Sequence, residues 1–327
     1  MSLFNTKNIA ILITCVAFLA SCSSTKTTAG EQPTEEVVEA SVEAPSSQPA
    51  SDIPESQPGA AVEKTALPSS QWIAERVKSS QERLSATRAG QTIWKAIEAH
   101  GGLEQWYSRG PLKFRFTYTP VDPEKTVRDS VQVIDTWSAR ARHSMPGNEA
   151  AQFGWDGSQA WSTQDEAINV NVRFWSLTPF YFVGVPFVMA DEGINLEEAG
   201  EIEFEGRTYD LVKATFAQGT GDAPDDFYVV YVDRETGRVG GVRYIVSYPG
   251  FFPDGGHSPE KFMAYDGEQR VDGVLFPQTF RTFMWDADKN TTLDLATNSS
   301  MTDVAFDATL TDSYFSVPEG ASIVDKM

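Results

Sequence analysis

The chain has 327 residues, with 26 basic against 46 acidic side chains and a formal net charge of −20. A surface this acidic repels nucleic acid, because phosphate binding requires clustered lysine and arginine. We therefore expect no nucleic-acid partner, and we interpret the acidity as a means of keeping the surface soluble.

The two cysteines, Cys15 and Cys22, both lie near the N-terminus, so no disulfide can hold the body of the protein together. Stability must come from a hydrophobic core. The chain can supply one, because 41% of its residues are hydrophobic and these include 20 Phe, 10 Tyr and 8 Trp.

A short apolar run, Ile9–Ala20, follows the basic residue Lys7. It is too short to span a bilayer as a helix, which needs roughly 20 residues, and it fits the hydrophobic part of a secretory signal. The run ends in Leu19-Ala20-Ser21-Cys22, which resembles the lipobox of bacterial lipoproteins. This resemblance implies that residues 1–21 are a lipoprotein signal peptide and that Cys22 is acylated, for example with palmitate. An ordinary cleaved signal or an uncleaved anchor is the alternative.

Acylation would anchor the protein to a membrane, because each buried methylene contributes roughly 0.8 kcal/mol and several chains together make the attachment stable. Ser23 rather than aspartate follows Cys22, which in lipoproteins of double-membrane bacteria favours the outer membrane. We expect an outer membrane lipoprotein whose folded domain faces the periplasm.

Residues 22–69 are expected to form a disordered tether. They are rich in Ser, Thr, Pro, Glu and Ala and nearly lack aromatic residues. Such a segment cannot bury enough apolar area to offset the entropy of ordering. As a flexible coil it would reach roughly 35–40 Å. The folded domain is expected to span residues 70–327.

Two helices, or one kinked helix, are predicted between residues 71 and 100, with Ser69 or Ser70 as the cap. Within Ile93–Trp106 apolar residues recur at helical spacing, and Gly101-Gly102 ends the helix because glycine tolerates left-handed dihedral angles. Few other helices are predicted, so we expect this segment to cover the open face of a sheet.

From Leu112 the apolar residues alternate with polar ones, which is typical of half-buried strands. Short connections join about eleven predicted strands, which favours a mainly β, antiparallel meander, sandwich or barrel. The predicted strands are Leu112–Tyr118, Ser130–Trp137, Phe153–Trp155, Gln159–Ser162, Ile202–Phe204, Tyr209–Phe216, Phe227–Val232, Val239–Ser247, Phe262–Tyr265, Val274–Met284 and Met301–Phe306. The segment Leu177–Ala190 contains two prolines and a glycine among aromatics, so we interpret it as a loop or short helix that packs against the sheet and could act as a lid.

Several short motifs, in this order, resemble a family of bacterial envelope lipoproteins whose fold is similar to the lipoprotein carriers LolA and LolB. The motifs are Ala96-Ile97-Glu98-Ala99-His100-Gly101-Gly102, Pro186-Phe187 with Asp191-x-Gly193, the hairpin from Tyr228 to Gly237, and Phe315-Ser316-x-Pro318. The resemblance implies about eleven antiparallel strands curved into an incomplete barrel, in a mainly β (α+β) fold. N-terminal helices would plug its concave face and leave an apolar cavity, which LolA and LolB use for acyl chains. A soluble carrier has no anchor, whereas this chain has one, and no functional residue of the carriers is placed on it.

Neither catalysis nor metal binding is strongly indicated. Of the three histidines, His100 is expected either to cap a helix C-terminus, where a cation is favoured, or to be partly buried with its hydrogen bonds satisfied. His143 and His257 lack a recognisable nucleophile motif. Asp222, Asp225 and Asp226 form a tight acidic loop that could bind Ca²⁺, although the spacing of an EF-hand loop is absent. No cofactor is expected.

The aromatic surplus points to a ligand cavity, because an unclosed barrel is not filled by its own strands alone. The residues expected to line it are Trp94, Ile97, Phe114, Phe116, Tyr181, Phe182 and Phe187. Our leading hypothesis is a non-enzymatic, membrane-anchored domain that buries a lipid or lipoprotein acyl chain between the sheet and the Ile93–Ile97 helix. The alternatives are a metal-dependent enzyme or module that uses Asp191 or the acidic loop, and an assembly subunit whose sheet edge pairs with an envelope protein partner.

Overall fold

The computed structural model describes residues 65–223 and 225–324. They belong to one compact unit, Ala60–Met327. The predicted signal peptide, the predicted acylation site Cys22 and most of the predicted tether lie outside the described residues. Ordered structure begins before residue 70, because Thr65 pairs with Thr311 and Ala66 is buried.

Two separate helices occupy the N-terminal part, α1 (Ser70–Ser85) and α2 (Arg88–Ala99). The Ser69 side chain accepts a hydrogen bond from the Trp72 N–H, and the Thr87 side chain accepts one from the Gly90 N–H. The turn between the helices is tight, since a β-carbon on Gly90 would lie 2.1 Å from the Leu84 carbonyl oxygen. The two caps and the tight turn show that this segment forms two separate helices and not one kinked helix.

Gly101 and Gly102 end α2 with positive φ angles of 118° and 83°, as predicted, and α3 (Leu103–Ser108) follows. The remaining helices are short: α4 (Val172–Trp175), α5 (Thr178–Val183) and the 3₁₀ turns η1 (Asp165–Ala167), η2 (Phe187–Ala190) and η3 (Asp312–Phe315). Among the described residues, no helix is both long and apolar enough to cross a membrane.

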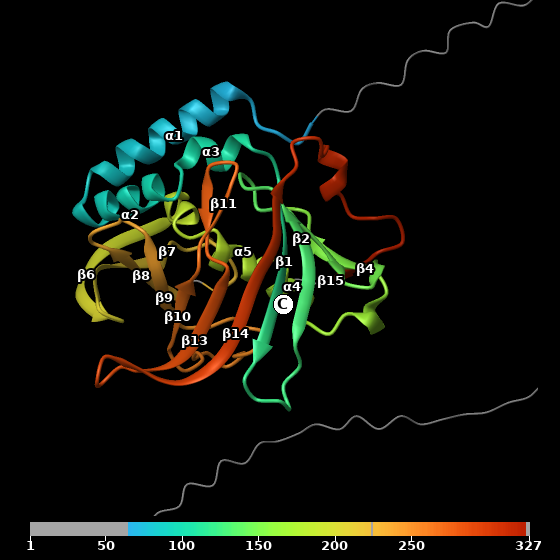
Figure 1. Ribbon diagram of the computed structural model, residues 1–327. Helices are drawn as coiled ribbons and strands as arrows, with labels where there is room; N and C mark the ends of the chain where they lie inside the picture. Colours follow the sequence, from blue (N-terminus) through green and yellow to red (C-terminus); the bar gives the residue numbers. More distant parts are fainter. Residues whose placement is uncertain (1–64, 224, 325–327) are drawn as a thin grey trace, which may run out of the picture. The chain divides into compact units, whose positions relative to one another are not determined.

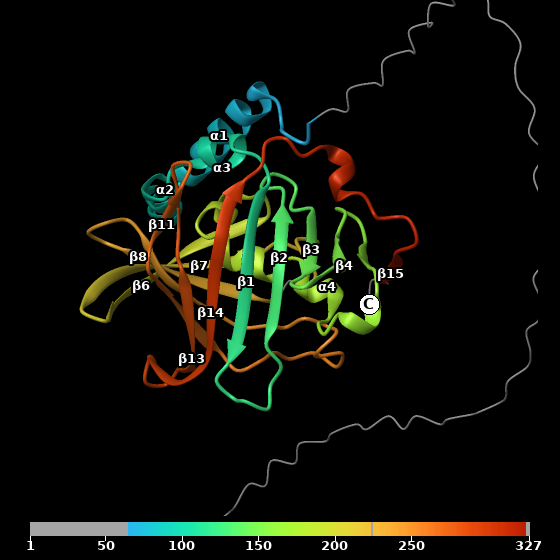
Figure 2. The ribbon, with the colours of Figure 1, turned by 45° about the vertical axis from the view of Figure 1, so that its right-hand side comes forward.

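The fold is mainly β and is dominated by one large antiparallel sheet (Figures 1 and 2). Its strands are β1 (Leu112–Pro120), β2 (Arg128–Ile134), β3 (Ala141–Met145), β4 (Asn148–Trp155), β5 (Ala160–Ser162), β6 (Ile194–Phe204), β7 (Arg207–Phe216), β8 (Phe227–Asp233), β9 (Val239–Tyr244), β10 (Lys261–Asp266), β13 (Thr279–Asp286), β14 (Thr291–Phe306) and β15 (Ser322–Val324). A separate hairpin consists of β11 (Gln269–Val271) and β12 (Val274–Phe276).

The strand order is β15-β5-β4-β3-β2-β1-β14-β13-β10-β9-β8-β7-β6. The long strand β14 returns between β1 and β13, and so joins the early strands to the late ones (Figure 2). In the described part of the chain the edge strands β6 and β15 do not pair with each other, so the sheet does not close into a barrel.

All eleven predicted runs form strands, but residues 65–223 and 225–324 contain fifteen strands. The run Val274–Met284 is divided, because Phe276 ends β12 and Thr279 begins β13 in another sheet. The strands β3, β11 and β15 were not predicted. They have three to five residues each, which is too short for an alternating pattern to stand out.

One face of the sheet, here called the inner face, carries the main core. Phe114 and Phe116 of β1 are 0% and 1% exposed and belong to the same apolar cluster as the buried residues of α2, α3, α5 and η2. Trp106 of α3 stacks on Phe187 of η2, with ring centroids 4.5 Å apart and planes inclined by 8°. The helix α2 contacts β6, β7, β8 and η2, and α1–α3 lie together at one end of the sheet (Figure 1).

The opposite face is also buried over β7–β10 and β13. Tyr231, Phe262 and Trp285 form a second apolar cluster there, and Phe204 at the end of β6 packs on Phe262 with ring centroids 4.8 Å apart. Burial on both faces explains why β8 is a continuous apolar run rather than an alternating one.

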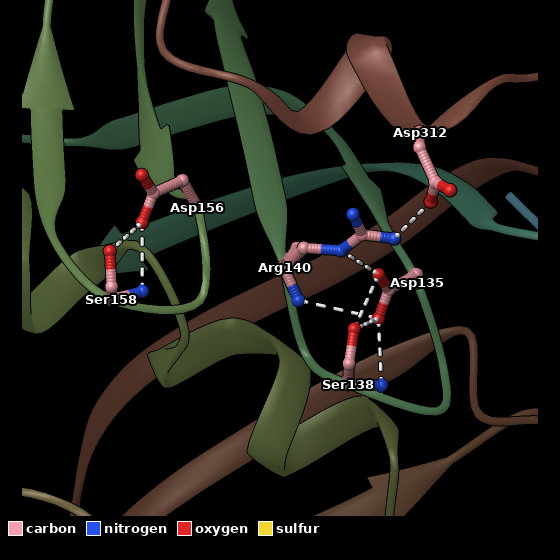
Figure 3. A network of polar contacts seen from close by, with 6 residues as sticks. All are labelled: Asp135, Ser138, Arg140, Asp156, Ser158 and Asp312. Carbon is pink, nitrogen blue, oxygen red and sulfur yellow. Dashed lines mark hydrogen bonds and ion pairs between the residues drawn. The ribbon is translucent and has the colours of Figure 1, made fainter.

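A polar network ties the C-terminal segment to the β2–β3 turn (Figure 3). The buried Asp135 carboxylate accepts hydrogen bonds from the backbone and hydroxyl of Ser138 and from Arg140 Nε at 2.6 Å. The same guanidinium pairs with Asp312 of η3 at 3.0 Å and covers the Phe315 ring. Both buried carboxylate oxygens of Asp135 therefore have hydrogen-bond partners. In the adjacent β4–β5 turn, the Asp156 carboxylate accepts hydrogen bonds from the backbone and the hydroxyl of Ser158.

His143 is completely buried on the inner face of β3. Its Nε2 lies 2.9 Å from the Ser176 carbonyl oxygen and its Nδ1 3.2 Å from the Ser130 hydroxyl, and its ring stacks on Phe153. Because a carbonyl oxygen only accepts, Nε2 carries the proton. Burial lowers the pKa of His143 to about 4, so the ring is neutral in the folded protein at pH 7.

We predict that Trp106→Ala destabilises the protein by about 3–5 kcal/mol, because it removes a ring that is 1% exposed and stacked on Phe187. Trp72→Ala is the matched control, since Trp72 is 36% exposed and touches only the edge of Tyr107. Urea unfolding followed by tryptophan fluorescence measures both. Equal losses in the two variants would contradict the central place of Trp106 in the core.

We predict that His143 makes the protein acid-sensitive. Its pKa is about 4 when folded and 6.5 in the reference state, so between these values the unfolded chain binds more protons and stability falls as the pH falls. The loss at pH 4 amounts to about 3 kcal/mol from this residue. His143→Gln should be less stable at pH 7 but should lose less on acidification from pH 6.5 to 4, as urea unfolding at several pH values will show. An unchanged pH dependence of stability in the variant would refute the conclusion that His143 makes the protein acid-sensitive.

Candidate functional site

A cavity of about 170 Å³, partly open to solvent, lies between the segment α4–α5–η2 and the strands β6–β9. Its lining is mainly apolar. The aromatic lining residues are Phe174, Tyr181, Phe182, Phe216, Tyr228, Tyr244 and Tyr248. The aliphatic ones include Leu177, Val188, Met189, Ile194, Ile245 and Val246.

Strand pairing assembles the aromatic wall. Tyr228 of β8 is the direct register partner of Tyr244 on β9, so both side chains emerge on the same face of the sheet. Phe182 of α5 packs over this pair, with ring centroids 5.1 Å from Tyr244 and 6.5 Å from Tyr228. Phe216 of β7 meets the edge of Tyr228 at 5.8 Å. Four elements far apart in the sequence thus supply one aromatic surface.

The segment Leu177–Ala190 is fixed from both sides. The Tyr265 hydroxyl of β10 donates a hydrogen bond of 2.6 Å to the Phe182 carbonyl oxygen. At its C-terminal end, Arg83 of α1 donates to the Ala190 carbonyl oxygen at 2.5 Å. The segment predicted as a lid is therefore α5 and η2, whose inner residues are buried in the core and whose outer residues line the cavity.

An ion pair borders the cavity on one side. Arg173 of α4 bonds to Asp222 at 2.6 Å, and its guanidinium lies 3.8 Å from the centre of the Trp155 ring. A cation over an indole ring is attracted by the partial negative charge of the ring face, although the ring as a whole is neutral. The pair and the stacked ring fix α4 against the loop that follows β7.

Asp226 reaches the cavity from the same loop. Its Oδ1 accepts hydrogen bonds from the Ser247 backbone N–H at 2.5 Å and the Ser247 hydroxyl at 2.7 Å. Burial raises the pKa of Asp226 above its usual range, although the two hydrogen bonds oppose this shift.

Asp191 lies at the opposite border, directly after η2, and pairs with Arg76 of α1 at 3.2 Å. Burial raises its pKa to about 6, and Arg76 opposes the rise. Because 45% of the side chain is exposed, solvent screens this charge and the shift contributes little to stability.

The predicted calcium loop does not form a metal site in the described part of the chain. There, no group of three or more His, Cys, Asp or Glu side chains is arranged to hold a metal ion. Asp222 forms an ion pair with Arg173, Asp226 accepts hydrogen bonds from Ser247, and Asp225 is exposed.

Of the residues predicted to line a cavity, Tyr181 and Phe182 do line this one. The other five lie elsewhere: Ile97, Phe114, Phe116 and Phe187 are 0–1% exposed in the packed core, and Trp94 lies half-buried against it. The physical reason is that Trp106 fills the space below α2, stacking on Phe187 and, at 6.0 Å, on Phe180. The cavity is consequently beside α5 rather than between the sheet and α2.

Sequence reasoning missed Tyr228, Tyr244 and Tyr248. Tyr228 and Tyr244 stand in runs that were predicted as strands. The sequence pattern does not say which residues of the two strands are neighbours, and only the β8–β9 register brings Tyr228 and Tyr244 side by side.

Within the described residues, neither His100 nor His257 pairs with a serine hydroxyl. The buried His100 donates from Nδ1 to the Ala96 carbonyl oxygen at 2.7 Å, and burial lowers its pKa to about 4. His100 is therefore a buried neutral ring with a satisfied hydrogen bond at the end of α2, which is the second of the two predicted alternatives, rather than a cation. Nδ1 of His257 lies 2.7 Å from the Ser258 carbonyl oxygen, whereas the Ser258 hydroxyl bonds to Pro259, so no serine–histidine pair forms.

A second, more polar cavity of about 280 Å³ lies beside the β8–β9 turn and β12. Its charged residues pair with one another: Arg207 bonds to Asp233 at 2.7 Å, and Arg238 bonds to Glu268. With these charges already neutralised, this cavity offers no free group to a charged ligand.

No family model and no curated protein matches the sequence. Among solved structures, the chain is similar to a LolA superfamily protein from Nitrosomonas europaea, with 11% identity, a TM-score of 0.46, and 71% of this chain and 98% of that chain covered.

Two further solved structures are similar to the chain. One is a DUF1329 family protein from Desulfovibrio piger, with 11% identity, a TM-score of 0.45, and 70% of this chain and 97% of that chain covered. The other is a proposed outer membrane lipoprotein-sorting protein domain from Vibrio parahaemolyticus, with 11% identity, a TM-score of 0.44, and the same two shares covered.

Proposed function

We propose that the chain is a membrane-anchored envelope lipoprotein whose domain binds an apolar ligand, such as a lipid or a lipoprotein acyl chain. The observation that carries this proposal is the aromatic cavity beside α5. A partly open apolar hollow with a few polar groups at its border is the usual form of a small-molecule site.

The volume limits what the cavity holds in its present form. An apolar cavity of about 150 Å³ accepts benzene, whereas pockets for drug-sized ligands run from roughly 300 Å³ upward. At about 170 Å³, this cavity suits one ring or the end of an alkyl chain. In the proposal, a longer chain enters end first and the remainder stays at the open side or displaces α5.

The anchor and the helices complete the proposal. Acylation at Cys22 would hold the domain at the outer membrane, facing the periplasm, and the tether would give it a reach of roughly 35–40 Å. The N-terminal helices would plug the concave face of the sheet, next to the segment that forms the cavity wall. The protein would act by binding and not as an enzyme.

Native mass spectrometry of the fragment Ala60–Met327, the compact unit, tests the proposal. We expect a retained apolar adduct that organic solvent removes, because burial of apolar surface drives such binding. A fragment that remains free of adduct after incubation with short-chain lipids and alkanes would count against ligand binding.

We predict that Phe182→Ala enlarges the cavity and increases the amount or length of retained ligand. Phe182 is 9% exposed and forms part of the wall, so its loss should cost less stability than the same change in the core. Phe114→Ala is the matched control, because Phe114 is 0% exposed and its removal should cost about 3–5 kcal/mol. Equal destabilisation of both variants with unchanged ligand retention would refute the role of Phe182.

A further inference from the structure

Asp226 differs from the other carboxylates that line the cavity, because no cationic side chain pairs with it. Asp222 is neutralised by Arg173 at 2.6 Å and Asp191 by Arg76 at 3.2 Å. Both hydrogen bonds to Asp226 come from Ser247 and end on Oδ1.

The second carboxylate oxygen of Asp226, Oδ2, has no hydrogen bond or ion pair within the described residues. The exposed His257 interacts with this charge only at longer range, and Asp225 adds a further negative charge. The cavity border therefore carries one uncompensated carboxylate with a free acceptor oxygen.

The aromatic wall suits a positive charge as well. The faces of aromatic rings carry a partial negative charge and attract cations within about 6 Å of the ring centre. Tyr181 and Tyr228, which line the cavity with Asp226, also have hydroxyls that make no hydrogen bond among the described residues. Arg173 is the one basic residue among the described lining residues, and Asp222 and Trp155 already occupy it.

From this juxtaposition we propose that the cavity binds an organic cation, an alkylammonium whose positive group meets Asp226 and the tyrosine faces while its alkyl part fills the apolar interior. The inference rests on the proposed function and specifies the class of its ligand. An anionic amphiphile, such as a fatty acid, would instead bring like charge to a buried carboxylate, which is unfavourable.

Isothermal titration calorimetry of the purified full chain tests the inference with three ligands that share one tail: hexyltrimethylammonium, 1-hexanol and hexyl sulfate, each below its micelle concentration. We expect the ammonium to bind about tenfold more tightly than the alcohol, because its charge is attracted by Asp226 and by the tyrosine faces without any N–H donor, and the sulfate to bind most weakly. Choline, which has no alkyl tail, shows whether the cation alone is recognised or whether the tail is required.

Two variants separate the site from general charge. Asp226→Asn keeps an acceptor for Ser247 and should weaken hexyltrimethylammonium about tenfold while leaving 1-hexanol unchanged. Asp225→Asn removes the same charge from the same loop, but Asp225 is exposed and does not line the cavity, so binding should change less than twofold. Thermal unfolding of both variants checks that the loop stays folded.

The possible outcomes are distinct. Equal binding of all three hexyl ligands, unaffected by Asp226→Asn, would overturn the cation inference and leave apolar-ligand binding intact. Equal weakening by Asp225→Asn would also overturn it, because the preference would then come from the overall negative charge. Binding of none of the three would overturn the proposed function and the cation inference together.

Discussion

An open antiparallel sheet with an apolar inner face must be covered, and the stack of Trp106 on Phe187 joins the two segments that cover it. Trp106 comes from the N-terminal helices and Phe187 from the segment that follows α5, so the 4.5 Å contact locks residues far apart in the chain onto one face. The hydrogen bonds from Tyr265 to Phe182 and from Arg83 to Ala190 hold the same segment near its middle and at its C-terminal end. The position of α5, and with it the cavity wall, depends on these contacts.

The cavity exists because this covering is incomplete on one side. Below α2 the rings of Trp106, Phe180 and Phe187 fill the interior, whereas beside α5 the wall consists of Phe182, Tyr228 and Tyr244 with space left between them and the loop after β7. The same loop supplies Asp222 and Asp226, so apolar lining and carboxylates meet at one border. This combination, and not the fold alone, suggests a ligand with an apolar and a cationic part.

Much of the secondary structure was predictable because it depends on local pattern. Alternation identified β1, a serine cap marked the start of α1, and glycines marked the end of α2. The sequence indicated an apolar cavity but not its position in the fold. Tyr181 and Phe182 line the cavity beside α5, whereas Phe114 and Phe116 of the alternating strand β1 lie in solid core. The sequence pattern shows that a side chain faces inward. It does not show whether side chains from other segments fill the space next to it.

The sequence by itself determined the composition of the core, the mainly β class and the periodicity of each element, since these follow from the order of apolar and polar residues along the chain. Only the tertiary structure decided that β14 lies between β1 and β13, that Tyr228 faces Tyr244, and that His100 is a buried neutral ring rather than a cation at a helix end. Strand register and burial arise from contacts between distant segments, and it is these contacts that set which side chains share a cavity and which charges stay unpaired.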